Sequence, residues 1–435
     1  MRVAVRAGTV GRQSPGPPGP SPGRTVAAGG SPVGWPFVSL YALSYAGGAL
    51  LFLGPLLVSL ALKVNHLVGS DAAPKDLALV TGVGSLLSIV SNPLCGRLSD
   101  RTTARTGMRR PWMLAGLAGG VAGTLIVAVA PSVFVVLVGW CVAQLALNAL
   151  LASQAAILPD QVPPAQRGVV SGVLGMCLPA ASVAATYLVQ AFDQNDLTMF
   201  LAPCLVGGFF VVVFAAKLPD RRLDAAARPA WSLREFAGSF YVNPRANPDF
   251  AWAFASRFML VMAYAFLVTY QAYYLIDHIG TRESAVPHQI YVGTLLQSAL
   301  LALTSPLAGR LSDRVGRRKV FVATAAVIYA FAMAVIATAG DVNGYLVGMA
   351  LTGLGFGMYM AVDLALVVDV LPESNSSAKD LGVLNIAGAL PFALAPAIAP
   401  AILGLTGNSY TALYLVAGAC AALGAAAIVP VRRTR

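Results

Sequence analysis

The segment NPLCGRLSDR at Asn92–Arg101 returns as SPLAGRLSDR at Ser305–Arg314, 213 residues later and with eight of ten positions identical. The same offset relates Leu158-Pro159 to Leu371-Pro372. Internal similarity at an interval of nearly half the chain indicates a duplicated unit. We therefore expect the two copies of this segment at equivalent places in two related halves.

Composition predicts that both halves lie in a membrane. Of the 435 residues, 57% are hydrophobic and 11% are charged, and the mean hydropathy is +0.73. Each crossing of a bilayer by a helix needs about 20 apolar residues. Long apolar runs, rather than ten-residue alternation, favour helices over a β-barrel. The predicted fold class is an all-α membrane protein with twelve transmembrane helices in two pseudo-symmetric six-helix bundles.

Twelve apolar runs can be placed, with ends good to a few residues. The first six are expected at 35–62, 77–97, 111–130, 133–157, 168–191 and 199–216. The other six are expected at 250–275, 287–309, 319–339, 344–370, 381–404 and 410–430. The chain then divides into a disordered tail (1–32), an N-terminal bundle (33–216), a linker (217–249), a C-terminal bundle (250–430) and a short tail (431–435).

Basic residues predict the orientation. Of the 29 Lys and Arg residues, 25 fall in alternate loops and the two tails, three fall in the other loops, and Arg257 lies within a run. Because Lys and Arg accumulate on the cytoplasmic side, we expect both termini in the cytoplasm and the linker with them. The net charge of +11 is thus explained by the cytoplasmic loops and tails, and no nucleic-acid partner is expected. A high Arg content suggests a bacterial source, and hence the cytoplasmic (inner) membrane.

The repeated segment itself has the features of a conformational latch. Its glycines allow close helix approach, its aspartates end a helix and can face the positive N-terminus of a helix from the other half, and its arginines stay in water. We expect it to hold the halves together on the cytoplasmic side when the cavity faces outward; the alternative is a loop that only fixes topology. The latch residues are Gly96, Arg97, Asp100, Arg101, Gly309, Arg310, Asp313 and Arg314.

The chain resembles the major facilitator superfamily. Its Gly-x-Leu-Ser-Asp-Arg segment between the second and third spans is similar to the signature loop of that superfamily. The resemblance covers roughly residues 33–430. The longer first copy, Asp100 to Trp112, is similar to the loop of glycoside–pentoside–hexuronide and sucrose-type carriers. The superfamily resemblance implies two six-helix bundles, a site at the membrane midplane and alternating access.

One departure concerns coupling. The subgroup resemblance implies acidic residues inside the second or fourth span, yet here Asp76 and Asp160 lie only at the ends of those spans. The usual cation site is therefore not matched. H+ and Na+ remain candidate coupling ions.

Ionisable side chains within the spans are candidates for coupling or gating, because charges in hydrocarbon are costly unless they pair or function. Arg257 and Asp363 each lie about eight residues from the cytoplasmic end of a span, or ~12 Å deep. The resemblance places both spans beside the cavity, so we expect an ion pair that solute or a proton breaks, or else a static pair. Asp369, nearer the interface, is a competing partner for Arg257.

Amides and phenols on the spans that would line the cavity predict hydrogen bonding and ring stacking with a polyhydroxyl solute. The candidate solute-binding residues are Tyr41, Tyr45, Gln144, Asn148, Tyr264, Gln271, Gln297 and Asn385. Tyr273 and Tyr274 fit an interfacial aromatic belt better. No metal spacing, cofactor motif or nucleotide-binding loop is present in the sequence, so neither an enzyme nor an ATP-driven pump is expected.

The sequence thus predicts a secondary carrier that moves a small solute, sugar- or glycoside-like, by alternating access, with lipid as its surroundings and a monomer as its state. The first alternative is proton-coupled export of drugs or metabolites, with Asp363 as the titrating acid. The second is a sensor that binds solute without moving it.

Overall fold

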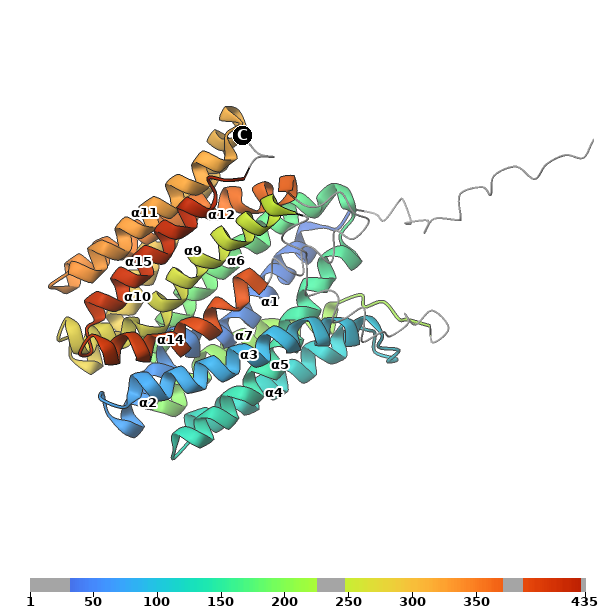
Figure 1. The fold of residues 1–435 in the computed structure, drawn as a ribbon. Helices are drawn as coiled ribbons and strands as arrows, with labels where there is room; N and C mark the ends of the chain where they lie inside the picture. Colours follow the sequence, from blue (N-terminus) through green and yellow to red (C-terminus); the bar gives the residue numbers. More distant parts are fainter. Residues whose placement is uncertain (1–31, 225–246, 371–385, 432–435) are drawn as a thin grey trace, which may run out of the picture.

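The computed structural model describes residues 32–224, 247–370 and 386–431, and side chains in the second range up to residue 363. Within these ranges, twelve helices are long and apolar enough to cross a membrane, and all the secondary structure is helical. The predicted fold class is therefore confirmed. Figure 1 shows the helices running alongside one another as a single bundle.

The first half contains seven helical segments and one π-helical turn. They are α1 (Trp35–Gly54), η1 (Pro55–Ser59), α2 (Leu60–Val68), α3 (Ala73–Asp100), α4 (Arg110–Ala128), α5 (Val133–Gln161), α6 (Pro164–Ala191) and α7 (Asp196–Lys217). Segments α1, η1 and α2 form one continuous crossing, Trp35–Val68. Several helices run past the predicted ends, because a helix continues beyond the hydrocarbon once it reaches water or headgroups.

The second half repeats this order. It contains α9 (Pro248–Tyr273), the π-helical turn η3 (Tyr274–His278), the short 3-10 turn η4 (Glu283–Ala285), α10 (Val286–Val315), α11 (Arg318–Thr338), α12 (Val342–Val370), α14 (Pro391–Leu405) and α15 (Tyr410–Ala427). A helical stretch at 386–389 continues into α14, so the eleventh crossing spans Ile386–Leu405.

Helix packing is the same in both halves. The pairs α3–α5, α4–α5 and α1–α7 of the first half correspond to α10–α12, α11–α12 and α9–α15 of the second. Between the halves, α3 packs against α14 and α6 packs against α10. The two copies of the repeated segment end α3 and α10 at the same end of the bundle. We call this the inner end, and the opposite end, where α2 meets α3 and α9 meets α10, the outer end.

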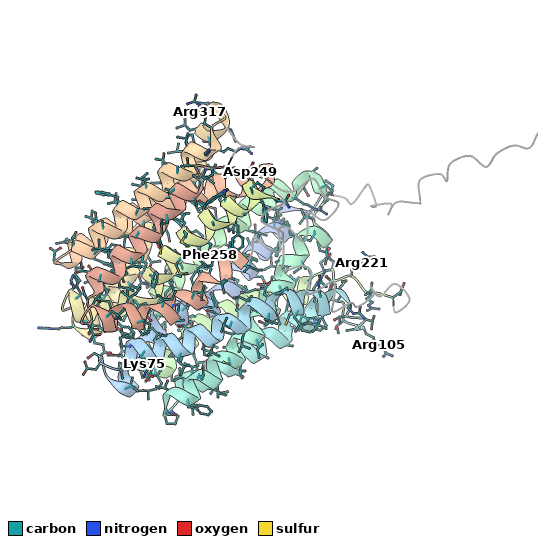
Figure 2. The ribbon with its side chains drawn as sticks, in the orientation of Figure 1. Lys75, Arg105, Arg221, Asp249, Phe258 and Arg317 are labelled. Atoms are coloured by element: carbon teal, nitrogen blue, oxygen red, sulfur yellow. The ribbon has the colours of Figure 1, made fainter. Side chains whose placement is uncertain are left out.

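Basic side chains mark the inner end. Figure 2 shows Arg105, Arg221 and Arg317 there, with Lys75 at the opposite end. This distribution agrees with the charge bias of the sequence.

Small residues bring helices into backbone contact at several crossings. A methyl group built at Gly47 of α1 would lie 2.5 Å from the carbonyl oxygen of Gly207 in α7. One built at Gly123 of α4 would lie 2.4 Å from the backbone nitrogen of Ala143 in α5. Neither position can accept a side chain without moving a helix.

The glycines of the repeated segment are different, which corrects one prediction. A methyl group built at Gly96 would lie 3.9 Å from Cβ of Ala152, and one at Gly309 would lie 3.8 Å from Cβ of Ala361. These are ordinary van der Waals separations, so helix approach does not require glycine there. The near-identical contact in the two halves does, however, reflect their pseudo-symmetry.

Candidate functional site

The outer end of the bundle is closed by side chains of α9 that reach across to the first half. The hydroxyl of Tyr273 donates to the carbonyl oxygens of Ala61 (3.0 Å) and Ala73 (3.4 Å). Nε2 of Gln271 donates to the carbonyl oxygen of Leu57 in η1 (3.2 Å). Leu57 and Ala61 lie in or beside η1, the π-helical turn in the first crossing of the first half. Gln271 and Tyr273 lie just before η3, the equivalent turn of the second half. Such turns rearrange backbone hydrogen bonds and occur often at functional sites.

A second set of outer contacts is charged. His66 of α2 lies between Asp196 of α7, at 3.3 Å from Nδ1, and Glu283 of η4, at 3.2 Å from Nε2. Nδ2 of Asn65 also donates to Glu283 (2.9 Å), and the buried Lys63 pairs with Asp196 (2.8 Å). Glu283 belongs to the second half, so this cluster joins the halves at the outer surface beside a cavity of about 440 Å³.

Contacts between the halves continue toward the middle along α6 and α10. The rings of Tyr187 and Tyr291 lie 5.6 Å apart, and the hydroxyls of Ser182 and Ser298 lie 3.4 Å apart. From the outer surface to this depth, the two halves are therefore in contact.

Below the closed outer end, α9 carries three of the predicted site residues at intervals of seven residues, which places them on one helix face. From the inner side they are Arg257, Tyr264 and Gln271. Two helical turns, or ~10 Å, separate each from the next. Figure 2 shows Phe258, the neighbour of Arg257, midway along the bundle.

At the inner level Arg257 pairs with Asp363 of α12. Nη1 of Arg257 donates to Oδ2 of Asp363 at 2.6 Å, and the Asp363 side chain is only 9% exposed. The structure thus brings together the two charges that the sequence placed at one depth. Gly388, in the helical stretch before α14, faces the other side of the guanidinium.

At the middle level three rings form an aromatic wall from three helices. Tyr264 stacks on Phe356 of α12 with centroids 4.8 Å apart and planes 15° apart. Phe392 of α14 meets Tyr264 edge-on at 6.0 Å. All three rings keep part of their surface accessible. The wall and the ion pair therefore lie on the same three helices, ~10 Å apart.

The amides expected to bind solute are largely engaged with protein. Nδ2 of Asn148 donates to the carbonyl oxygen of Gln144 (2.8 Å), and Asn92 donates to Asn148 (3.2 Å). Gln297 donates to Thr352 at 2.9 Å. Gln144, Asn148, Gln271 and Gln297 are each less than a tenth exposed. In this conformation Asn148, Gln271 and Gln297 join neighbouring helices, whereas Gln144 bonds to Asn148 within α5.

The two tyrosines of α1 that were predicted to contact solute differ in their surroundings. Tyr41 is fully buried, donates to the carbonyl oxygen of Gln154 (2.7 Å) and stacks on Phe214 of α7, so it packs α1 within the first half rather than facing a solute. Tyr45 is partly exposed and meets Tyr41 edge-on. Asn385 and the side chain of Asp369 lie outside the described residues.

A charge network at the inner end of the first half escaped the sequence analysis. The buried Arg109, which precedes α4, binds Asp160 of α5 (2.8 Å), Asp100 of α3 (2.6 Å) and the hydroxyl of Ser99 (2.7 Å). Burial alone would lower the pKa of this guanidinium, but the hydrogen bonds and charges of Asp160 and Asp100 raise it overall. The signal in the sequence is the run of Arg that follows Asp100.

The position before α4 is also held by a residue that follows α7, a helix that packs against α4. Asp220, just beyond α7, accepts hydrogen bonds from the backbone nitrogens of Arg109 (2.8 Å) and Arg110 (2.7 Å). A carboxylate at the start of a helix satisfies free N–H groups and opposes the positive end of the helix dipole.

The latch aspartates have partners within their own halves in this structure. Asp100 binds Arg109, and Asp313 lies 3.8 Å from Arg318. Gly96, Arg97 and Arg101 are partly exposed, and Arg310 and Arg314 are exposed. A cross-half latch remains a prediction for a conformation with the inner end closed.

The comparisons with known proteins agree with this architecture. The family model of the Major Facilitator Superfamily matches twice, over residues 37–288 and 284–435. The chain belongs to this superfamily. The two matches together cover both halves. Membership makes the protein a secondary transporter of small solutes and not an enzyme.

Solved structures of transporters share the fold at low identity. A mutant of peptide transporter POT has a TM-score of 0.73 at 14% identity, covering 93% of this chain and 97% of that one. A mutant of nucleoside transporter NupG has 0.71 at 13%, covering 91% and 99%. A bacterial homologue of the human lysosomal transporter Spinster has 0.69 at 14%, covering 92% and 99%. No curated protein matches the sequence significantly.

Proposed function

We propose that this superfamily member moves its solute by alternating access, and that the structure represents the state closed to the outside. The observation that carries this proposal is the contact between the halves from the outer surface down to Ser182 and Ser298. A solute at the level of Arg257 or Tyr264 then has access only from the inner side. The Spinster homologue, which has the same fold, is described as inward-facing and unoccupied.

The proposed solute site lies between the ion pair of Arg257 and Asp363 and the aromatic wall of Tyr264, Phe356 and Phe392. A charge inside a membrane costs about 2.5–3.5 kcal/mol or more when it is unpaired, so a helix rarely keeps one without a partner or function. The pair joins α9 to α12, and the wall joins the same helices to α14. Anything that weakens the pair would change how these three helices pack, as alternating access requires.

Two solute classes follow from the sequence, and the geometry bears on both. A sugar- or glycoside-like solute fits the ring face of Tyr264, since sugars stack on aromatic rings. It has less support from the amides, which are bonded within the protein. Proton-coupled transport of a drug or metabolite has support from Asp363, a buried carboxylate held by one arginine.

We place the protein in a bacterial cytoplasmic membrane as a monomer, with both termini and the linker at 217–249 in the cytoplasm. The linker joins bundles at 33–216 and 250–430 that rotate against each other. The repeated segments act as the latch when the inner end closes.

Cross-linking the outer end tests alternating access directly. Asn65 and Glu283 approach to 2.9 Å across the two halves, so cysteines at both positions can be joined by a short, reversible bifunctional thiol reagent. Cross-linked protein in proteoliposomes should lose counterflow, and reductant should restore it. The two single-cysteine variants treated alike are the controls. Full counterflow by cross-linked protein would refute alternating access.

Counterflow of a solute panel tests the substrate class. The panel contains sugars, organic anions and cationic dyes, each with and without a pH gradient. Counterflow of neutral sugars that ignores the pH gradient would support the sugar-like class. Transport that depends on the gradient and is lost in Asp363→Asn would support proton coupling. If Asp363→Asn left both uptake and its pH dependence intact, the role given to the pair would be wrong.

A further inference from the structure

The guanidinium of Arg257 uses only part of its hydrogen-bonding capacity. Nη1 donates to Asp363, whereas Nε is buried and has no hydrogen-bond partner among the described residues. Nε and Nη2 form the side-on edge of a guanidinium, whose two N–H groups point the same way and match the two oxygens of a carboxylate, phosphate or sulfate. This edge is separate from the nitrogen that Asp363 occupies.

Gly388 lies beside this edge and places no side chain over it. A methyl group built on Gly388 would lie 3.8 Å from Nη2 and 3.9 Å from Nε. Any larger side chain at this position would cover the edge from the direction of the eleventh crossing. A buried N–H without an acceptor costs about 1–3 kcal/mol, and an acidic group of the solute that accepts from Nε would remove this cost.

The aromatic wall adds an apolar requirement. Tyr264 lies seven residues further along α9 than Arg257, a rise of ~10 Å, and its ring stacks on Phe356. A solute that contacts both features carries its acceptor at one end and a planar or apolar group at the other. A small inorganic anion would fill the edge and leave the wall empty.

On the basis of the transport function proposed above, we propose that the Nε–Nη2 edge of Arg257 binds the acidic group of an organic anion whose apolar part lies against Tyr264, Phe356 and Phe392. This assigns the solute to the amphipathic organic acids rather than to neutral sugars or cations. Arg257 confers the selectivity for charge, and Gly388 keeps its edge open.

Charge balance then links the anion to a proton. Arg257 with Asp363 is neutral, and the acid group of the solute adds a second carboxylate to one guanidinium. Two carboxylates that share one cation in a medium of low dielectric constant cannot both stay ionised at low cost. The titratable groups facing Asp363 are Arg257 from α9 and Tyr359 from α12 itself, with no other among the described residues of the packed helices.

Asp363 therefore takes up a proton when the anion binds and releases it when the anion leaves. One anion and one proton cross together, so the cycle moves no net charge. Transport should rise with an inward proton gradient and should not respond to membrane potential.

Binding to the detergent-purified full-length protein tests the site. The probes are 3-phenylpropionate and 5-phenylpentanoate, each compared with its primary amide, which has nearly the same shape and no charge. Isothermal titration calorimetry should show at least one acid binding about tenfold or more tightly than its amide. Arg257→Gln should remove this preference. Arg282→Gln, at an exposed arginine of an outer connection, is the matched control and should keep it.

Two further variants separate binding from folding. Gly388→Val keeps both residues of the Arg257–Asp363 pair but covers the Nε–Nη2 edge with a side chain. It should weaken binding of the acid about tenfold and leave binding of the amide unchanged. Asp363→Asn should bind the acid with an affinity that no longer depends on pH. Equal affinity for acid and amide, no acid binding, or acid preference that survives both Arg257→Gln and Gly388→Val would overturn the inference.

The outcomes distinguish this inference from the proposed function. Acid-selective binding without counterflow in proteoliposomes would leave the anion site standing and refute transport. Counterflow of neutral sugars that is unaffected by Arg257→Gln would support transport and refute the anion site.

Discussion

Tyr273 provides a sharp test of how the outer end is held closed. Its hydroxyl donates across the halves to the carbonyl oxygens of Ala61 and Ala73. These bonds exist only while the outer end is closed, because the acceptors belong to the other half. Tyr273→Phe removes the hydroxyl and keeps the ring, so it should destabilise the closed state and leave packing nearly unchanged.

The size of the effect follows from the bonds lost. A protein hydrogen bond contributes a net 0.5–1.5 kcal/mol, and the 3.4 Å contact adds little to the one at 3.0 Å. The ratio of outer-open to outer-closed protein should therefore rise roughly 2- to 12-fold. Tyr274→Phe is the matched control. The hydroxyl of Tyr274 makes a shorter bond of 2.7 Å, but to Ile336 within the same half.

Distances between spin labels can measure this ratio. Labels at the exposed Ser70 and Ser284 report on opposite halves at the outer end, in a background without the five native cysteines. The longer-distance population should grow in Tyr273→Phe and stay unchanged in Tyr274→Phe. An equal shift in both variants, or none in Tyr273→Phe, would refute the assignment of these bonds to the outer closure.

Three other predictions concern stability and the outer closure. Arg109→Gln should lower the melting temperature in detergent, with a loss of about 2–3 kcal/mol because two carboxylates lose a buried partner; the exposed Arg105→Gln should not. Gly123→Ala should cost about 1–3 kcal/mol, since its methyl group would meet backbone at 2.4 Å, whereas Gly172→Ala, with nothing within 4 Å, should be neutral or slightly stabilising. His66 lies between two carboxylates of different halves. His66→Ala removes both contacts, so the closed outer state should lose population in the spin-label distances, by less than about 1 kcal/mol because the site is exposed.

Local sequence was sufficient for the fold because lipid imposes a strict rule on each span. An apolar run of about 20 residues must become a helix when no water is present to satisfy its backbone. Twelve runs and one repeated segment therefore predicted twelve crossings and two related halves. The ends of the helices were less accurate, since beyond the hydrocarbon either helix or loop can satisfy the backbone. The extension of the first crossing through Pro55–Ser59 to Val68 is one such case.

The site was predicted unevenly. Arg257 and Asp363 could be paired because a charge within an apolar run is rare and needs a partner. The tyrosines and amides could not be sorted in this way. Tyr41 and Tyr264 both lie in the first crossing of a half, yet Tyr41 packs inside its bundle and Tyr264 faces the aromatic wall. The direction in which each side chain points depends on the rotation of its helix, which the spacing of apolar residues does not fix when most of the helix is apolar.

By itself, then, the sequence determined what each segment must satisfy locally: the crossings, their duplication and the depth of the two intramembrane charges. Its basic loops also predict an orientation. The tertiary structure alone decided which atoms meet. It showed that Tyr273 and Gln271 close the outer end on backbone carbonyls, and that Arg109 joins Asp100 to Asp160. It also showed that Arg257 keeps one edge unbonded beside Gly388. These contacts depend on angles and separations between helices distant in sequence, which no local pattern specifies.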